Sequence, residues 1–472
     1  MKVLFLRPHS TVPACTPPLG VLSLTSYIRK YGGHEATIFD GRVLMIPHER
    51  IKPYIEHYNP DIVGITAMSA ERNQAHELAE LSKELFPKVP VVIGGPYTTA
   101  EWNRVLADKN IDYAVIGEGE STLLNLLKFL EEGNNYPEIK GLAFRKDGIP
   151  LFFGFQESIA DLDSIPMVAW DAIDLELYIH NKKKRCGMNQ HCSSERVAPV
   201  LTTRGCPYQC SYCHNMFGKK LRQRSAEHVM NELIYLKRNY DIKEIDIIDD
   251  IFNFDKARAM KICGLIIEEK LNIRFTFPNG LRTDLMDEEL VDKLIEAGAR
   301  RFVYPIESGS PEVQKRVKKN LNLEKAKKII DYTASKNVSV GSYFILGFID
   351  ETEEEMRMTI NFAFKSKIVT ASFFVLQPFP NTKIYEQAVE AGYIKQEKEL
   401  QQYYSAIQNI SKVSKERIDK LRRYAMCRFY FNPWRMYRFF RTTPVRHAFW
   451  TKVKLIMLYL FTTNPEEKGA LF

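Results

Sequence analysis

Two series of alternating strand and helix patterns, separated by an irregular stretch, constrain the fold of this chain more than any other feature. In the first series, short β-branched runs lie at residues 3–6, 62–66, 89–93 and 112–116, and a longer amphipathic segment follows each run. Such alternation predicts an α/β domain with a parallel, doubly wound, Rossmann-like sheet. We assign this domain to residues 1–137.

The second series contains six strand patterns separated by segments of helical length. They lie at residues 197–203, 244–248, 273–277, 302–306, 342–346 and 372–376. Six such units predict a partial (β/α)6 barrel related to the eightfold one, with active-site residues at the carboxyl ends of its strands. We assign the barrel to residues 195–395, a linker with a short hairpin to residues 138–194, and a helical C-terminal region to residues 396–472.

Three of the eight cysteines stand close together, directly after the first strand of the second series. Cys206, Cys210 and Cys213 have C-x3-C-x2-C spacing. Three thiolates can bind three corners of a four-iron four-sulfur cluster and leave the fourth iron open to a chelating ligand. An open coordination position is typical of a catalytic metal centre. We interpret the other cysteines as loop or buried thiols: Cys15, Cys186, Cys192, Cys263 and Cys427.

Three other interpretations of this motif remain open from the spacing alone. Residues 210–214 match a haem-attachment pattern, Cys210 and Cys213 match a redox pair, and His214 could complete a zinc site. Haem attachment requires export, but the N-terminal apolar run is too short for a signal peptide, so we expect a cytoplasmic protein. A redox pair leaves Cys206 unexplained, and zinc ligands normally come as two separated pairs. The cluster is therefore favoured.

With these motifs the chain resembles the radical S-adenosylmethionine superfamily, specifically the group with an N-terminal cobalamin-binding domain. The resemblance covers most of residues 1–395 and implies that the three cysteines ligate the cluster. It places Tyr212 beside the adenine of S-adenosylmethionine. It also assigns Asp249 or Asp250 to an acidic turn that holds the amino group of that cofactor.

Two further motifs match family positions near the carboxylate and ribose of S-adenosylmethionine. Arg282 could bind the carboxylate, and Glu307 could accept hydrogen bonds from the sugar hydroxyls. An ion pair across the barrel mouth is the alternative for each residue. The family turn after the sixth strand usually has glycine where Asn381 stands, and asparagine tolerates the positive φ that such a turn needs.

In the N-terminal domain the resemblance is to cobalamin-binding modules, although the D-x-H-x-x-G motif that ligates cobalt in one class is absent after the first strand. Small residues in turns after strands are the candidate contacts, because a bulky corrin can approach the backbone there. Ordinary tight turns are the alternative. The candidates are Ser69, Gly94, Gly95, Gly117 and Gly119.

The C-terminal region interleaves cations with aromatic residues. Residues 412–454 contain 13 Lys/Arg and two acidic residues, so this stretch alone exceeds the net charge of +8 of the whole chain. A helical cap on the barrel and peripheral contact with an anionic membrane through residues 421–460 are both compatible with this pattern. Nucleic-acid binding is disfavoured, because the rest of the chain has no matching basic composition.

The resemblance implies reductive cleavage of S-adenosylmethionine, with electrons from a flavodoxin- or ferredoxin-type donor. The resulting radical takes a hydrogen atom from an unactivated carbon, and cobalamin implies methyl transfer to that carbon. The substrate is expected to be a small or lipid-like molecule. Cyclisation or rearrangement of a hydrophobic, lipid or tetrapyrrole-like substrate is the alternative activity, methylthiolation is disfavoured by the lack of further N-terminal cysteines, and a non-catalytic cobalamin- or membrane-binding protein is the alternative without chemistry.

Overall fold

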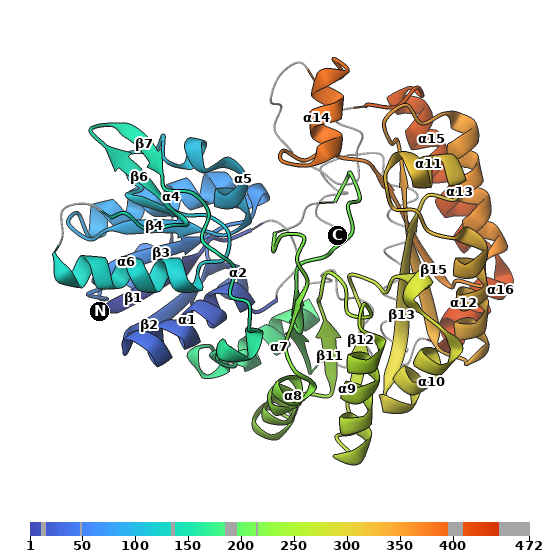
Figure 1. The fold of residues 1–472 in the computed structure, drawn as a ribbon, viewed down its shortest axis with the longest axis horizontal. Coiled ribbons are helices and arrows are strands. Elements are labelled where there is room, and N and C mark those ends of the chain that lie inside the picture. Colours follow the sequence, from blue (N-terminus) through green and yellow to red (C-terminus); the bar gives the residue numbers. More distant parts are fainter. Residues whose placement is uncertain are drawn as a thin grey trace. The chain divides into compact units, whose positions relative to one another are not determined.

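The computed structural model describes residues 1–10, 16–47, 50–133, 137–184, 196–213, 216–394 and 409–442. The chain divides into two compact units, Met1–Arg185 and Cys186–Phe472 (Figure 1). The predicted loop thiols Cys15, Cys186 and Cys192, the candidate zinc ligand His214 and the tail beyond residue 442 lie outside the described residues.

The first unit is built on a seven-stranded sheet of order β2-β1-β3-β4-β5-β6-β7. The first five strands in this order are parallel, and β6 and β7 are antiparallel additions. This confirms the predicted parallel, doubly wound fold class. The strands are β1 (Lys2–Arg7), β2 (Glu35–Asp40), β3 (Ile62–Thr66), β4 (Val91–Gly94), β5 (Tyr113–Val115), β6 (Leu142–Lys146) and β7 (Ile149–Phe152).

Helices cover both faces of this sheet because successive residues of a buried strand point to opposite sides. Leu4 and Leu6 pack into one core with residues of α4 and α5, and Val3 and Phe5 pack into another with residues of α1 and α6. The helices of the unit are α1 (Leu19–Gly32), α2 (Gly41–Leu44), α3 (Lys52–Ile55), α4 (Arg72–Leu85), α5 (Pro96–Val105), α6 (Glu120–Glu132) and α7 (Leu175–Lys184).

The segment predicted as a linker, residues 138–194, differs from that expectation over its described part. Residues 142–152 form the hairpin, but the hairpin extends the sheet of the first unit, because β6 pairs antiparallel with β5 and β7 pairs antiparallel with β6. The hydroxyl of Tyr178 on α7 donates a 2.7 Å hydrogen bond to the buried carboxylate of Asp40. Sequence periodicity does not reveal such pairing, because a hairpin pattern is the same whether the hairpin stands alone or joins a sheet edge.

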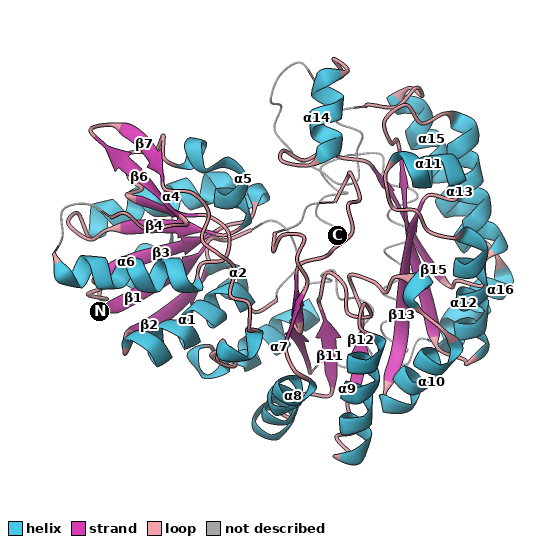
Figure 2. Cartoon of the chain, viewed as in Figure 1, coloured by secondary structure: helices cyan, strands magenta, loops and turns pink. Residues whose placement is uncertain are grey.

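The second unit contains a six-stranded parallel sheet of order β15-β14-β13-β12-β11-β8, as expected for an incomplete barrel. Figure 2 shows helices along one face of this sheet. The strands are β8 (Val197–Val200), β11 (Glu244–Ile247), β12 (Arg274–Thr276), β13 (Ala299–Glu307), β14 (Ser339–Leu346) and β15 (Thr370–Val375); β9 (Thr203–Arg204) and β10 (Arg222–Gln223) form a separate two-stranded ladder.

The helices of the barrel alternate with its strands, and two more helices follow at its C-terminal end. They are α8 (Ala226–Tyr240), α9 (Lys256–Glu268), α10 (Glu288–Ala297), α11 (Pro311–Arg316), α12 (Leu323–Ser335), α13 (Glu353–Lys365), α14 (Lys383–Glu390), α15 (Lys415–Tyr430) and α16 (Pro433–Thr442). Over the described ranges, no helix combines the length and the apolar character that crossing a bilayer requires.

Candidate cofactor site

The cysteine loop follows β8 at the carboxyl edge of the barrel sheet, and its backbone is held at several points. Gly205 adopts φ +87°, and a Cβ there would lie 2.4 Å from the carbonyl oxygen of Lys220. The amide of Ser211 donates to the carbonyl of Val317, and the carbonyl of Ser211 accepts from the amide of Ile384, both at 2.9 Å. Only glycine fits the first position. The loop therefore presents its thiols from an anchored backbone.

The three cysteines of the loop form no disulfide and lie close enough to influence one another. Desolvation by the surrounding protein raises the pKa of the Cys213 thiol to about 12, and the neighbouring Cys210 and Cys206 add to this effect. Burial likewise raises the pKa of Cys206. Because only the thiolate ligates a metal, a cluster that binds here must displace these protons.

The described residues include no group of three or more His, Cys, Asp or Glu side chains placed around a single metal ion. A cubane cluster does not require such convergence, because each cysteine ligates a different iron. The donor set of this loop, three thiols at one strand end, thus fits an iron–sulfur cluster better than one zinc ion.

The two candidate carboxylates after β11 have different surroundings. Asp249 is buried, and its Oδ1 accepts from the amides of Thr202 and Thr203 at 2.5 and 3.1 Å, while its Oδ2 accepts from the Thr202 hydroxyl. These bonds interrupt the predicted strand 197–203 between β8 and β9. Asp250 is exposed by its surface area; partial desolvation by the surrounding protein, and then Asp249, raise its pKa to about 6. Asp250 also raises the pKa values of Cys206 and Cys213, so it is the carboxylate near the thiols.

Arg282 lies after β12 and is engaged with protein groups. Its guanidinium stacks on the Tyr208 ring of the cysteine loop, 3.6 Å from the ring centroid. Its Nε donates to Asp284, and its Nη2 donates to the carbonyl of Lys319 at 2.6 Å. The side chain is buried. In this arrangement Arg282 orders the cysteine loop, as a cation held against an aromatic face does.

Glu307 ends β13 in a left-handed conformation, with φ +66°. Its carboxylate forms a buried ion pair with Lys319 at 3.2 Å. Lys319 is in turn near enough to Cys213 to lower the pKa of that thiol. The sequence does not mark Lys319 as a site residue, because a lysine within a Lys-Lys-Asn turn is indistinguishable from solvated surface charge until its burial is known.

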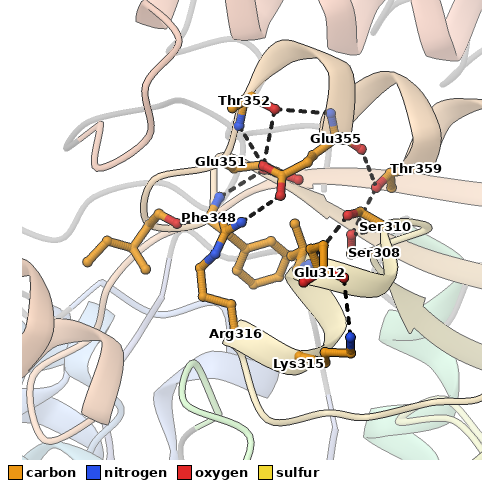
Figure 3. Close-up of polar contacts among 12 residues, drawn as sticks. Ser308, Ser310, Glu312, Lys315, Arg316, Phe348, Glu351, Thr352, Glu355 and Thr359 are labelled. Atoms are coloured by element: carbon orange, nitrogen blue, oxygen red, sulfur yellow. Dashed lines mark hydrogen bonds and ion pairs between the residues drawn. The ribbon is translucent and has the colours of Figure 1, made fainter.

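Tyr212, the residue before the third cysteine, packs in a ring pair, and a buried carboxylate fixes the backbone of its partner ring. The ring of Tyr212 packs edge-on against Phe348, with 5.4 Å between centroids. The carboxylate of Glu351 accepts from the amides of Gly347 and Phe348 at 2.6 and 3.0 Å. Figure 3 shows Glu351 turned back onto this loop and Arg316 reaching Glu355. Glu351 thus fixes the backbone that carries the Phe348 ring.

Two residues after β15 are unusual, one in its backbone angle and one in its lack of hydrogen bonds. Asn381 has φ +65°, as predicted for the turn after the sixth strand. Gln377, two residues after the end of β15, is buried, and neither its amide nitrogen nor its amide oxygen has a hydrogen-bond partner. A buried amide without partners is costly, so a ligand group that pairs with it would be stabilising.

In the first unit, the five candidate corrin contacts follow three adjacent parallel strands at the carboxyl edge of the sheet. Ser69 lies after β3, Gly94 and Gly95 lie at the end of β4, and Gly117 and Gly119 follow β5. A Cβ on Gly117 would meet nothing within 4 Å, and one on Gly94 would make only ordinary contacts. Ligands of open α/β sheets bind at such strand ends.

The same edge of the first unit has a helix start that offers a hydrogen-bonding group. Thr98, in the first turn of α5, is buried, and its hydroxyl has no partner. Open space beside glycine backbone, together with an unpartnered hydroxyl, fits a large ligand with polar substituents such as a corrin.

The structure thus collects Cys206, Cys210, Cys213 and Asp250 at the carboxyl ends of the neighbouring strands β8 and β11, with Tyr212 among them. Asp249, Arg282 and Glu307 lie at the same edge, but their polar atoms bind protein groups. The small residues of the first unit form a separate group on their own sheet.

Family models match both units. The B12 binding domain matches residues 9–127, and the radical SAM superfamily matches residues 200–363. An uncharacterized methyltransferase of Pyrococcus horikoshii is 31% identical over 445 residues, covering 92% of this chain and 93% of its own. The cytidylyl-2-hydroxyethylphosphonate methyltransferase of Streptomyces wedmorensis is 29% identical, covering 84% of each chain.

Two solved structures share the fold. The cobalamin-dependent S-adenosylmethionine radical enzyme OxsB superposes with a TM-score of 0.68 at 18% identity, covering 83% of this chain and 55% of that one. The radical S-adenosylmethionine methyltransferase TsrM from Kitasatospora setae superposes with a TM-score of 0.70 at 19% identity, covering 84% and 77%. The chain belongs to the cobalamin-binding group of the radical S-adenosylmethionine superfamily, and its cofactors are a four-iron four-sulfur cluster, S-adenosylmethionine and cobalamin.

Proposed function

We propose that this enzyme transfers a methyl group to an unactivated carbon of a small molecule. The observation that carries the proposal is one chain that joins a three-cysteine barrel site to a B12 binding domain and aligns over nearly its full length with a methyltransferase. When bound, the cluster and S-adenosylmethionine supply one-electron cleavage that generates a hydrogen-abstracting radical, and cobalamin supplies the methyl group.

We assign the cluster to Cys206, Cys210 and Cys213, and the amino group of S-adenosylmethionine to Asp250. Asp250 lies near the thiols, whereas the carboxylate of Asp249 accepts hydrogen bonds from backbone amides. Lys319, paired with Glu307 beside Cys213, is a cation suited to the carboxylate of the same cofactor. Tyr212 and Phe348 form an apolar ring pair suited to an adenine.

Asp249, Arg282 and Glu351 have a different proposed role, which is to hold the loops in place. Asp249 fixes the start of the cysteine loop through two backbone amides. Arg282 stacks on Tyr208 within that loop. We further assign the corrin to the glycine turns of the first unit, where the backbone is open beside Gly117, and to the Thr98 hydroxyl.

A second activity, ring closure, is favoured by one group of relatives. The anaerobic magnesium-protoporphyrin IX monomethyl ester cyclase of Rubrivivax gelatinosus is 26% identical over 399 residues, covering 82% of this chain and 70% of its own. Methyl transfer is preferred because the relatives with higher identity are methyltransferases. In both cases we propose a reducing cytoplasmic setting and a flavodoxin- or ferredoxin-type donor, as an open cluster site requires.

Product analysis after anaerobic reconstitution with iron, sulfide and cobalamin tests the proposal. With a low-potential reductant, methyl transfer produces both 5′-deoxyadenosine and S-adenosylhomocysteine, and a trideuteromethyl label on S-adenosylmethionine appears on cobalamin. Ring closure produces 5′-deoxyadenosine without S-adenosylhomocysteine. Absence of 5′-deoxyadenosine from a chain that has bound its iron would reject both activities.

A further inference from the structure

The two C-terminal helices expose a concentration of aromatic side chains. Of the 17 large hydrophobic side chains exposed among the described residues, five fall within residues 424–440. We call them, together with the exposed Arg423, Arg428 and Arg441, the aromatic strip. Its aromatic members and their exposed fractions are Tyr424 (43%), Phe431 (60%), Trp434 (47%), Tyr437 (61%) and Phe440 (46%).

The orientation of α16 is set by its inner face. Phe439 is 1% exposed and packs with Met436 against Val369. The guanidinium of Arg435 is buried and donates to the carbonyls of Ala363 and Ser366 at 3.1 and 3.2 Å. Because these residues face the barrel, the aromatic residues spaced at three-residue intervals from 431 to 440 face outward. The strip is therefore a surface of the folded unit.

The charge around the strip has one sign. Arg423, Arg428 and Arg441 are exposed, and the guanidinium of Arg438 lies 5.1 Å from the centroid of the Trp434 ring. The sequence contains no acidic residue from 421 to 454. Exposed aromatics among arginines, without intervening carboxylates, are the composition that interfacial helices use on anionic bilayers.

The strip lies at the amino edge of the barrel sheet, opposite the cysteine loop. Val369 directly precedes β15, and Arg438 donates to the carbonyl of Ala334 at the end of α12, which leads into β14. The cysteine loop follows the carboxyl end of β8 in the same parallel sheet. An electron donor must approach the cluster, so the strip is unsuited to that partner. A docking surface at the amino edge leaves the carboxyl edge, where the cysteine loop lies, accessible.

We propose that the aromatic strip docks the enzyme on an anionic membrane surface, with its aromatic rings at headgroup level and its arginines on lipid phosphates. This proposal is independent of the reaction catalysed. It also separates membrane contact from substrate entry, because the docking surface and the cofactor edge lie at opposite ends of the barrel strands.

Flotation of the full chain with vesicles tests the docking. Vesicles of phosphatidylcholine alone are compared with vesicles that contain about 30% phosphatidylglycerol. The wild-type chain floats with the anionic vesicles only. The Trp434→Ser/Tyr437→Ser variant binds them at least about tenfold more weakly, since two interfacial rings are lost. The matched control, Tyr54→Ser/Phe155→Ser, removes two comparably exposed aromatic residues of the first unit and binds as the wild type does.

The contribution of the arginines to membrane binding is tested by Arg423→Gln and Arg441→Gln. Each substitution is expected to weaken binding to anionic vesicles about fivefold at low salt. Yields of 5′-deoxyadenosine equal to those of the wild type verify that the variants are folded. The proposal is overturned if the full chain fails to float with anionic vesicles, or if the Trp434→Ser/Tyr437→Ser variant floats as the wild type does. Equal flotation with neutral vesicles would refute the role of the arginines. Flotation needs no cofactor, so its failure leaves the proposed chemistry unaffected.

Discussion

The two edges of the barrel sheet differ in their charged side chains: carboxylates and cations stand together at the carboxyl edge, and arginines stand at the amino edge. At the carboxyl edge, burial raises the pKa values of Asp249, Asp250 and Glu351, which favours their neutral forms. At the amino edge, burial lowers the pKa values of Arg435 and Arg438. The carboxyl edge also holds the buried cations Arg282 and Lys319, so it suits a ligand that carries both charges, such as an amino acid, whereas the amino edge suits anionic partners. The same sheet thus presents two surfaces of different chemistry.

The largest expected effect lies at the carboxyl edge, in the cysteines. Cys206→Ala removes one cluster ligand, so iron incorporation falls and formation of 5′-deoxyadenosine drops below detection. Iron content and visible absorption after anaerobic reconstitution measure the first quantity, and chromatography measures the second. Cys427→Ala, a half-buried thiol of α15, is the matched control and keeps both. Equal iron content in the two variants would contradict the cluster assignment.

Glu351 is the buried group at this edge for which we expect the largest effect on stability. Glu351→Ala leaves the amides of Gly347 and Phe348 without their acceptor, which costs about 2–4 kcal/mol. Glu351→Gln keeps an acceptor oxygen there and loses less. Urea unfolding of both variants and the wild type measures the difference. A Glu351→Ala variant as stable as Glu351→Gln would refute the anchoring role.

The same residue predicts a pH dependence. Burial raises the pKa of Glu351 from 4.5 to about 8, so between these values the folded chain holds a proton that the unfolded chain has lost. The contribution of Glu351 to stability therefore falls as pH rises from about 5 to about 8. Relative to the wild type, Glu351→Gln becomes more stable across that range. Urea midpoints at pH 6 and pH 8 test this, and an unchanged difference would contradict the raised pKa.

We expect substitutions of the adjacent Asp249 and Asp250 to affect different quantities, namely stability and cofactor binding. Asp250→Asn raises the KM for S-adenosylmethionine about tenfold with little change in stability, because a charged contact to the ammonium group is lost. Asp249→Asn instead lowers the urea midpoint, because it weakens the acceptor for Thr202 and Thr203. Steady-state kinetics and unfolding curves of both variants distinguish the roles. A KM effect larger in Asp249→Asn would reverse the assignment.

The smallest expected effect is at the amino edge. The Tyr430 hydroxyl accepts from the amide of Ala371 and donates to its carbonyl, at 3.1 and 2.9 Å. Tyr430→Phe therefore lowers stability by about 1 kcal/mol and leaves S-adenosylmethionine cleavage unchanged. Thermal unfolding and product yield are the measurements. A loss of cleavage activity would show that a change at the amino edge affects the chemistry at the carboxyl edge.

Several features followed from the sequence because they depend on local pattern. The β-branched runs predicted the parallel sheets, and the C-x3-C-x2-C spacing after β8 predicted the cluster site. Asn381 adopts the positive φ expected for its turn. Strand periodicity and ligand spacing are properties of short segments, so they can be read without knowing which segments meet.

Other features depend on contacts between distant segments. The hairpin at 142–152 belongs to the first sheet, and Asp249 bonds Thr202 and Thr203, about 47 residues earlier in the chain. Lys319 and Gln377 look like ordinary surface residues in sequence, and only their burial marks them as candidate contacts. The outward direction of the aromatic strip is likewise set by what Arg435 and Phe439 contact.

By itself, the sequence determined the two α/β units and the three cysteines at the spacing of cluster ligands, because local periodicity and spacing specify both. Tertiary structure alone decided which of two adjacent aspartates remains available to a ligand and which face of the C-terminal helices reaches solvent. The physical reason is that burial and hydrogen bonding, which set the charge state and accessibility of a side chain, arise from residues far away in the chain.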